Sequence, residues 1–185
     1  MQYDSNFNPN SFYVEPLIGV KGEITNKITV DVRAGYRHQK YDGSTLVTNE
    51  NFSGAVLRGW IAFQATKDDL INLSGERSVY ESLYQNLNYY TGGLGRLTYK
   101  HDFSEKWSVS PYFFYRINTY PEATTEGTVT QKRRDYYLGF GVSASYIMRD
   151  WIAFQARYAY NGNNSNFNVF DYKDNVFGIS TVIGF

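Results

Sequence analysis

Two histidines, His38 and His101, are the residues of this sequence best suited by type to acid–base chemistry near neutral pH. A catalytic histidine needs a nucleophile or a carboxylate within hydrogen-bonding reach. The sequence spacing assembles no Ser–His or Asp–His arrangement, and we interpret both histidines as interfacial residues. Phosphate-loop and metal-ligand spacings are missing, and there are no cysteines. We therefore predict no catalytic residue, no cofactor and no metal site.

A second set of reactive groups is ionic and recurs at alternating positions along the chain. Guanidinium groups in a row can pass or hold anionic or hydroxylated solutes. The other interpretation is an internal network of ion pairs that only solvates a wall, because buried charges have to be paired. The residues predicted to line a lumen under the first interpretation are Asp31, Arg33, Arg37, Arg58, Arg96, Arg116 and Arg157.

Alternation of apolar and polar residues indicates the elements that carry these side chains. In residues 27–40, KITVDVRAGYRHQK, the first set is Ile28, Val30, Val32, Ala34 and Tyr36. The intervening positions hold Thr29, Asp31, Arg33, Gly35, Arg37 and Gln39. A helix would mix the two sets, whereas a strand places them on opposite faces.

The same alternation recurs in residues 52–66, 107–120, 134–148, 151–161 and 174–185, and more weakly in 11–24, 70–80 and 89–100. We therefore predict an all-β fold with about nine antiparallel strands. A tilted strand that crosses a membrane needs about 9–11 residues, which these segments reach. The prediction is a single outer-membrane β-barrel domain over residues 1–185, with no helical membrane span.

The expected connections alternate between short and long. Short turns fall near residues 25–27, 67–69, 104–106 and 149–150, and long polar stretches cover 42–51, 80–88, 121–133 and 162–173. Outer-membrane barrels have short periplasmic turns and long external loops. Aromatic girdles mark both membrane interfaces, and the residues predicted for them are Trp107, Trp151, Tyr36, Tyr136 and Tyr160.

Composition agrees with a membrane wall. Aromatic residues make up 18% of the chain, yet the mean hydropathy is −0.47. A wall with one apolar face and one polar face has this combination. Lysine plus arginine and aspartate plus glutamate both total 18, which speaks against nucleic-acid binding.

The last strand, residues 177–185, ends on Phe185. Such an ending resembles the C-terminal signal by which the outer-membrane assembly machinery recognises barrels. More narrowly, the sequence resembles the putative beta-barrel porin 2 family, which is linked to exopolysaccharide systems. The residues that carry the resemblance lie at 134–136, 139–146, 151, 158–160, 165–166, 172 and 175, with weaker support from 77–80 and 89–90. The resemblance implies the outer membrane of a Gram-negative bacterium, with lipid, lipopolysaccharide and polysaccharide as partners.

Strand direction leaves the extent of the barrel open. The first and last predicted strands both lead toward the short-turn side, so they would meet in parallel. Bacterial single-chain barrels have even numbers of antiparallel strands. The sequence is therefore interpreted as the C-terminal part of a larger barrel, with a miscounted strand or a parallel seam as alternatives.

Three functional hypotheses follow. The first is a porin-like or polysaccharide-export pore, selective through its inward charges. The second is a closed barrel that serves as a structural or adhesive module through its long outer loops, for which the Asn-rich residues 162–171 are a candidate glycan site. The third, an enzyme embedded in a barrel, lacks a reactive constellation. The basic run Lys132-Arg133-Arg134 is either a contact for lipopolysaccharide phosphates or a solvated loop base.

Overall fold

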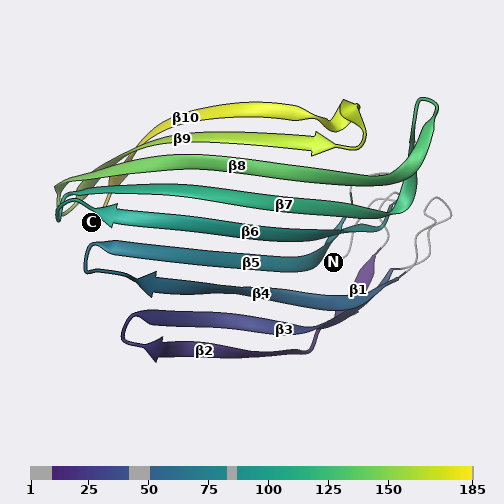
Figure 1. Ribbon diagram of the computed structural model, residues 1–185, viewed down its shortest axis with the longest axis horizontal. Helices are drawn as coiled ribbons and strands as arrows, with labels where there is room; N and C mark the ends of the chain where they lie inside the picture. Colours follow the sequence, from purple (N-terminus) through teal and green to yellow (C-terminus); the bar gives the residue numbers. More distant parts are fainter. Residues whose placement is uncertain (1–9, 42–50, 83–86, 185) are drawn as a thin grey trace.

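The computed structural model describes residues 10–41, 51–82 and 87–184 and consists of one antiparallel sheet (Figure 1). Its strands are β1 (Ser11–Val14), β2 (Leu17–Thr25), β3 (Ile28–Tyr41), β4 (Phe52–Gln64), β5 (Asp69–Glu81), β6 (Tyr89–Asp102), β7 (Trp107–Glu126), β8 (Val129–Arg149), β9 (Ile152–Ser165) and β10 (Tyr172–Ile183). One short 3₁₀ helix, η1 (Asn168–Phe170), precedes β10. The predicted all-β antiparallel fold is confirmed.

Strand order follows the sequence from β3 to β10, so each of these strands pairs with the next along the chain. β1 and β2 both pair with β3, and together they occupy the position of one strand. Their interruption at Glu15–Pro16 accounts for ten strands where the sequence predicted about nine. Proline has no N–H to donate and is tolerated in a sheet mainly at edges.

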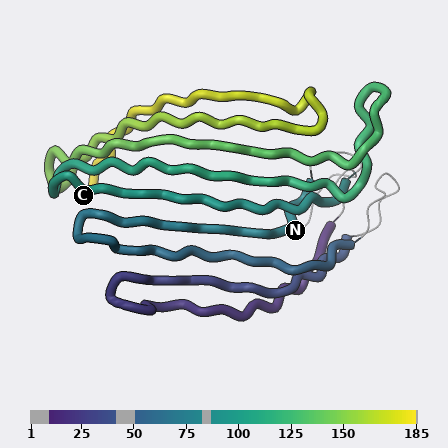
Figure 2. Tube along the Cα trace, viewed as in Figure 1, coloured from purple at the N-terminus to yellow at the C-terminus, as the bar shows by residue number. Residues whose placement is uncertain are grey.

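The sheet is open, with β2 and β10 at its two edges. The chain traces in Figure 1 and Figure 2 place the short turns after β2, β4, β6 and β8 at one end of the strands, and the β7–β8 turn and η1 at the other. We refer to these ends as the short-turn rim and the long-connection rim. Both edge strands run from the long-connection rim toward the short-turn rim, as the sequence predicted, so a direct contact between them would be parallel.

One predicted long loop is a hairpin instead. β7 and β8 continue through most of residues 121–133, with Glu126 paired to Val129 across a tight turn. Gly127 has φ +60° in that turn, a conformation that favours glycine. The prediction was wrong here because the threonine-rich segment has no apolar alternation to indicate a strand, although threonine itself favours strands.

Well-buried apolar side chains gather near the long-connection rim, and they are Phe52, Val56, Val79, Leu87, Tyr120 and Phe167. Over the rest of the sheet, large apolar residues remain exposed, including Ile18, Phe177 and Ile179 at 82%, 79% and 88%. No helix in the described ranges has the length and apolar character needed to cross a membrane. The sheet is thus a single layer, and its two faces have to be considered separately.

Candidate functional site

The predicted lumen residues share one face of the sheet, which we call the polar face. Asp31, Arg33 and Arg37 alternate along β3, and Arg33 lies directly opposite Arg58 of β4. Residues opposite each other in a ladder project to the same side. Following the ladders across the sheet places Glu76, Leu94 and Arg116, and then Tyr137 and Asn163, on the side of Arg58. By strand alternation Arg96 and Arg157 also face this side. That this face lines a lumen remains a prediction.

Carboxylates neutralise the arginines near the β2 edge. Arg33 donates from Nε and Nη2 to the two oxygens of Asp31, at 2.9 and 2.8 Å. Arg37 donates from Nε to Glu15 at 2.5 Å, and Arg58 binds the other oxygen of the same carboxylate. Glu15 sits in the break between β1 and β2, where it reaches both guanidinium groups. The ion-pair network considered from the sequence is therefore present in this part of the polar face.

A buried ion pair lies at the long-connection rim of the polar face. Arg133 donates to both oxygens of Asp135 at 2.9 and 2.7 Å, and Asp135 is fully buried. The guanidinium carbon of Arg133 lies 4.6 Å from the ring centroid of Tyr120 and 3.4 Å from that of Phe170. Arg133 is therefore not part of a solvated loop base. Because strand residues alternate in direction, its exposed neighbours Lys132 and Arg134 project to the other side.

Tyrosine rings extend this rim cluster across three strands. Tyr80 and Tyr90 stack with centroids 5.4 Å apart, and Tyr90 and Tyr120 stack at 5.2 Å. The oxygen atoms Asn118 Oδ1 and Asn163 Oδ1 are buried on this face and accept no hydrogen bond from the residues that the structure describes. Sequence reasoning missed this cluster, because the rings meet only once the strand register is known. Alternating tyrosines near the strand ends were the available signal.

The polar face has a different character toward β10. Arg96 and Arg157 line a cavity of about 440 Å³ that spans β6 to β10. Neither arginine forms an ion pair with a carboxylate in the part of the chain that the structure describes. Arg96 instead lies over the ring of Tyr112, 4.3 Å from its centroid. The hydroxyl and amide side chains that share the lining are Thr98, Ser110, Ser143, Gln155 and Asn161.

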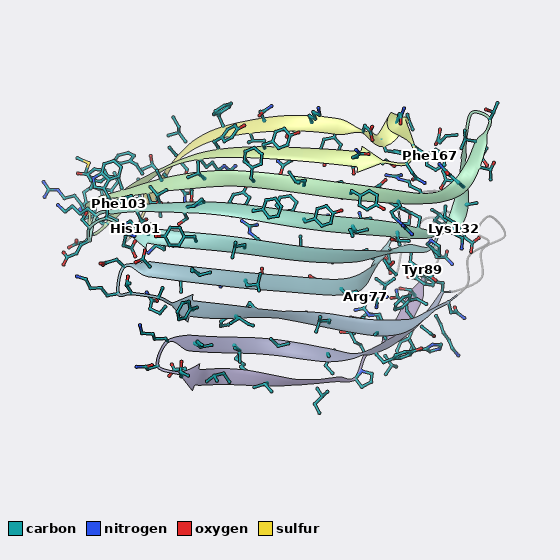
Figure 3. All side chains as sticks on the ribbon, in the orientation of Figure 1. Arg77, Tyr89, His101, Phe103, Lys132 and Phe167 are labelled. Atoms are coloured by element: carbon teal, nitrogen blue, oxygen red, sulfur yellow. The ribbon has the colours of Figure 1, made fainter. Side chains whose placement is uncertain are left out.

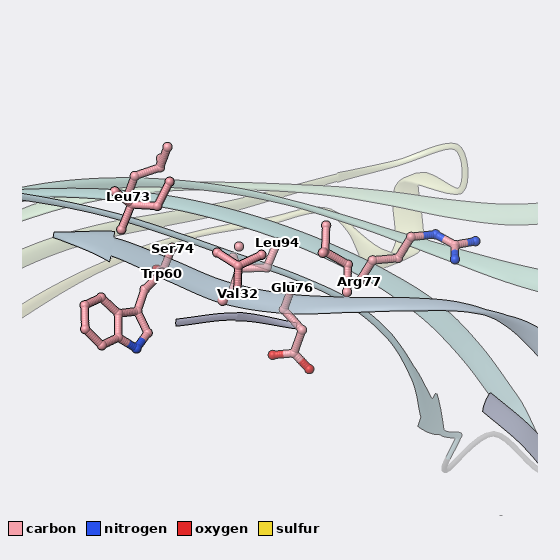
Figure 4. Close-up of a pocket in the computed structure, with 11 residues that line it drawn as sticks. Val32, Trp60, Leu73, Ser74, Glu76, Arg77 and Leu94 are labelled. Atoms are coloured by element: carbon pink, nitrogen blue, oxygen red, sulfur yellow. The ribbon is translucent and has the colours of Figure 1, made fainter. Parts of the chain in front are cut away.

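On the opposite, apolar face, aliphatic and aromatic side chains point away from the sheet. A hollow of about 360 Å³ lies among Val32, Leu57, Ile61 and Leu73. Figure 4 shows Leu73 on one side of the ribbon and Trp60 and Glu76 on the other, as strand alternation requires. Arg77 is an exception on the apolar face, opposite Leu57, and it donates from Nη1 to the carbonyl oxygen of Ala55.

Of the predicted girdle aromatics, Trp107 and Trp151 lie at strand ends, whereas Tyr36, Tyr136 and Tyr160 lie within β3, β8 and β9. Trp107 begins β7 and stacks on Tyr146 at 4.5 Å, and Trp151 occupies the turn before β9. Tyr36 is 53% exposed on β3, Tyr136 stacks on Tyr115 at 6.5 Å, and Tyr160 stacks on Phe140 at 5.1 Å. Their contact with a membrane interface remains a prediction. Phe185, predicted to carry the assembly signal, lies outside the described residues.

Each histidine has a side-chain partner that the sequence analysis did not find. His38 Nδ1 lies 2.6 Å from Ser53 Oγ, and His101 Nδ1 lies 2.7 Å from Asp69 Oδ1. The pairs sit at opposite rims, and Figure 3 shows His101 beside Phe103 at the short-turn end. Among the described residues, no three His, Cys, Asp or Glu side chains converge to hold a metal ion. The two contacts are separated by the length of the sheet and do not form one site.

Comparison with protein families decides the relationship of this sheet to known proteins. The sequence matches the family described as Putative beta-barrel porin 2 over residues 2–185. The chain belongs to this family. No curated protein matches the sequence. Membership in the putative beta-barrel porin 2 family confirms the resemblance found in the sequence and agrees with the antiparallel all-β structure. Porin-type barrels carry a polar inner and an apolar outer face, and the two faces described above have this division.

Proposed function

We propose that this member of the putative beta-barrel porin 2 family forms the wall of an outer-membrane pore in a Gram-negative bacterium. The observation that carries the proposal is the division of residue types between the two faces, to which Leu94 on the polar face and Arg77 on the apolar face are exceptions. Arginines, carboxylates, hydroxyls and amides occupy one face, and exposed aliphatic and aromatic residues occupy the other. In water such an apolar face would be unfavourable, whereas lipid stabilises it.

The backbone supports the same assignment. Unpaired N–H and C=O groups cost several kcal/mol each in hydrocarbon, so spanning sheets are closed. The outer edges of β2 and β10 are unpaired among the described residues. In the membrane these edges are paired, and the polar face then surrounds an aqueous path. Lipid and lipopolysaccharide contact the outside, and the assembly machinery recognises the C-terminal strand through Phe185.

The mechanism is passive passage through a polar lumen, with selectivity from inward charges. The hydrophilic lining is suited to hydroxylated solutes, including polysaccharide under export. Purified full-length protein in a planar bilayer tests the proposal through single-channel conductance. Discrete conductance steps are expected. The absence of conductance in intact, folded protein would contradict the proposed transport function.

A paired substitution tests which face meets lipid. Leu97 and Thr98 are neighbours on β6 with opposite directions, and Leu97 is 46% exposed on the apolar face. Leu97→Arg should destabilise the membrane-inserted protein by about 2–4 kcal/mol, the range for arginine at the bilayer midplane. Thr98→Arg should leave stability within about 1 kcal/mol, because on the proposed water-filled side the added charge stays solvated and its repulsion from Arg96 is screened. Equal effects would contradict the assignment of the faces.

A closed barrel that acts as a structural or adhesive module is the second candidate. The observation in its favour is the side-chain packing at the long-connection rim, where Phe167 is buried and Phe170 lies over Arg133. Asn166 also ties this segment to β8, donating to Lys132 O at 2.9 Å and accepting from Arg134 N at 2.8 Å. Deleting residues 162–171 distinguishes the two candidate functions. Loss of surface binding with unchanged permeability favours the adhesive module over the pore.

A further inference from the structure

Two exposed arginines on the polar face, Arg96 and Arg157, differ from Arg33, Arg37 and Arg58 in their surroundings. Arg33 and Arg37 each bind a carboxylate directly, at 2.8 and 2.5 Å. Arg96 on β6 and Arg157 on β9 are exposed and form no ion pair with any described carboxylate. Arg116 also forms no ion pair with a described carboxylate, but it is half-buried and lies over Tyr137, 5.8 Å from the ring centroid. A guanidinium without an internal partner keeps its full capacity for a bidentate contact with an external anion.

Both arginines line the same cavity of about 440 Å³, which no carboxylate lines. Asp174 borders the cavity without lining it: it lies on the same face of β10, directly opposite the lining residue Asn161. The remaining polar groups of the cavity are uncharged hydroxyls and amides, from Ser110, Ser143 and other residues. The site therefore combines positive charge with neutral groups that can both donate and accept hydrogen bonds.

Glycines in the neighbouring strands let the long side chains lie flat against the wall. The ring of Tyr112 covers Gly141, where an added Cβ would come within 2.8 Å of the ring. The guanidinium carbon of Arg96 lies 4.3 Å from the centroid of this ring. Arg157 crosses Gly178 in the same way, with Nε 2.7 Å from the place of a Cβ. Both guanidinium groups therefore lie along the wall of the cavity.

We propose that this cavity binds saccharides that carry a carboxylate. Guanidinium groups recognise the carboxylate through charge-assisted hydrogen bonds, and Ser, Gln and Asn side chains bind the ring hydroxyls. The inference rests on the proposed pore, since the polar face has to border water. It names the class of solute that the pore retains during passage: an anionic, hydroxyl-rich molecule rather than a neutral sugar.

Calorimetric titration of the full chain in detergent micelles tests the site without any need for conductance. The probes are trigalacturonate, the neutral sugar maltotriose and inorganic phosphate. Trigalacturonate should bind at least about ten-fold more tightly than either of the others, because a hydrogen bond to a charged group contributes about 1.5–3 kcal/mol. Equal affinity for maltotriose, or for phosphate, overturns the proposal.

Substitution locates the binding. The double variant Arg96→Gln with Arg157→Gln should lose at least about ten-fold in affinity for trigalacturonate. Arg33→Gln is the matched control, an exposed arginine of the same face that already binds Asp31, and should change affinity less than about three-fold. Both variants alter exposed side chains, and the heat-dependent electrophoretic mobility of barrels verifies folding. Unchanged affinity in the folded double variant overturns the site.

Conductance separates this inference from the proposed function. If the protein binds trigalacturonate but conducts no ions, the proposed binding site is supported and the proposed pore is contradicted. If the protein conducts ions but does not bind trigalacturonate, the proposed pore is supported and the proposed binding site is contradicted. The two proposals therefore fail on different measurements.

Discussion

Two arginine–aspartate pairs on the polar face have the same local geometry in different surroundings. In each pair the residues are two positions apart on one strand, Asp31 with Arg33 on β3 and Arg133 with Asp135 on β8. In each, Nε and Nη2 of the arginine bind the two carboxylate oxygens at 2.7–2.9 Å. A spacing of two places both side chains on the same face of a strand, so the pairing itself is a local property.

The two arginine–aspartate pairs differ in burial. The side chains of Arg33 and Asp31 are 46% and 14% exposed, whereas those of Arg133 and Asp135 are 8% and 0% exposed. Tyr120 of β7 and Phe170 of η1 cover the second pair. An exposed ion pair contributes little to stability because water screens it. Removing one partner of a buried pair is strongly destabilising, because the other charge stays buried without its counter-charge. Non-local contacts, not sequence spacing, thus determine what the same motif contributes.

The largest effect should follow from breaking the buried pair. Asp135→Ala leaves the Arg133 guanidinium buried without its counter-charge, and we expect a loss of about 3–5 kcal/mol in the free energy of unfolding. Equilibrium urea unfolding in lipid vesicles measures it. A loss below about 1 kcal/mol would contradict the burial argument, because that is the range of an exposed pair.

Replacing both partners separates the missing charge from lost packing. Arg133→Met together with Asp135→Leu removes the pair and leaves no unpaired charge. Because such exchanges are often neutral or stabilising, this variant should recover most of the stability lost in Asp135→Ala. If it is as unstable as the single variant, packing around the pair is responsible.

Glu15 provides an intermediate case between the two pairs. Its side chain is 7% exposed and binds Arg37, which is 12% exposed, as well as Arg58. Glu15→Gln removes the charge from two hydrogen-bonded ion pairs at once, and we expect a loss of about 1.5–3 kcal/mol in the unfolding free energy. The same urea titration measures it. Glu23→Gln, on the same polar face of β2, is the control and should stay within about 0.5 kcal/mol.

Strand positions were predictable because each segment shows the two-residue alternation of a strand independently of the rest of the chain. Residues 27–40 were predicted as a strand, and β3 covers Ile28–Tyr41. The break at Glu15–Pro16 was missed although proline disfavours a continuous strand, because alternation on both sides of it continues in register with β3. The buried pair and its aromatic cover were beyond sequence reasoning. Tyr120 and Phe170 reach Arg133 from 13 and 37 residues away, through strand register and the turn before β10.

The aromatic cover of the buried pair can itself be tested. Phe170→Leu keeps an apolar side chain and removes the ring over Arg133. We expect the free energy of unfolding to fall by about 1–2 kcal/mol, in the range of a desolvated cation–π contact. Val169→Ala is the matched control in the same 3₁₀ turn, because Val169 is 69% exposed, and should lose less than about 0.5 kcal/mol. Equal losses in the two variants would show that the turn, and not the ring, stabilises the pair.

The smallest effect should come from the exposed pair, and it completes the comparison. Asp31→Asn removes the same bidentate contact that Asp135→Ala removes, yet Arg33 stays solvated and keeps its hydration. We expect a change below about 1 kcal/mol in the unfolding free energy. Because salt screens exposed charges over about 10 Å at 0.1 M, the remaining difference from the parent protein should diminish at 0.5 M salt. The buried pair should show no such salt dependence, so a loss in Asp31→Asn that is large and insensitive to salt would mean that this part of the polar face is as dry as the rim.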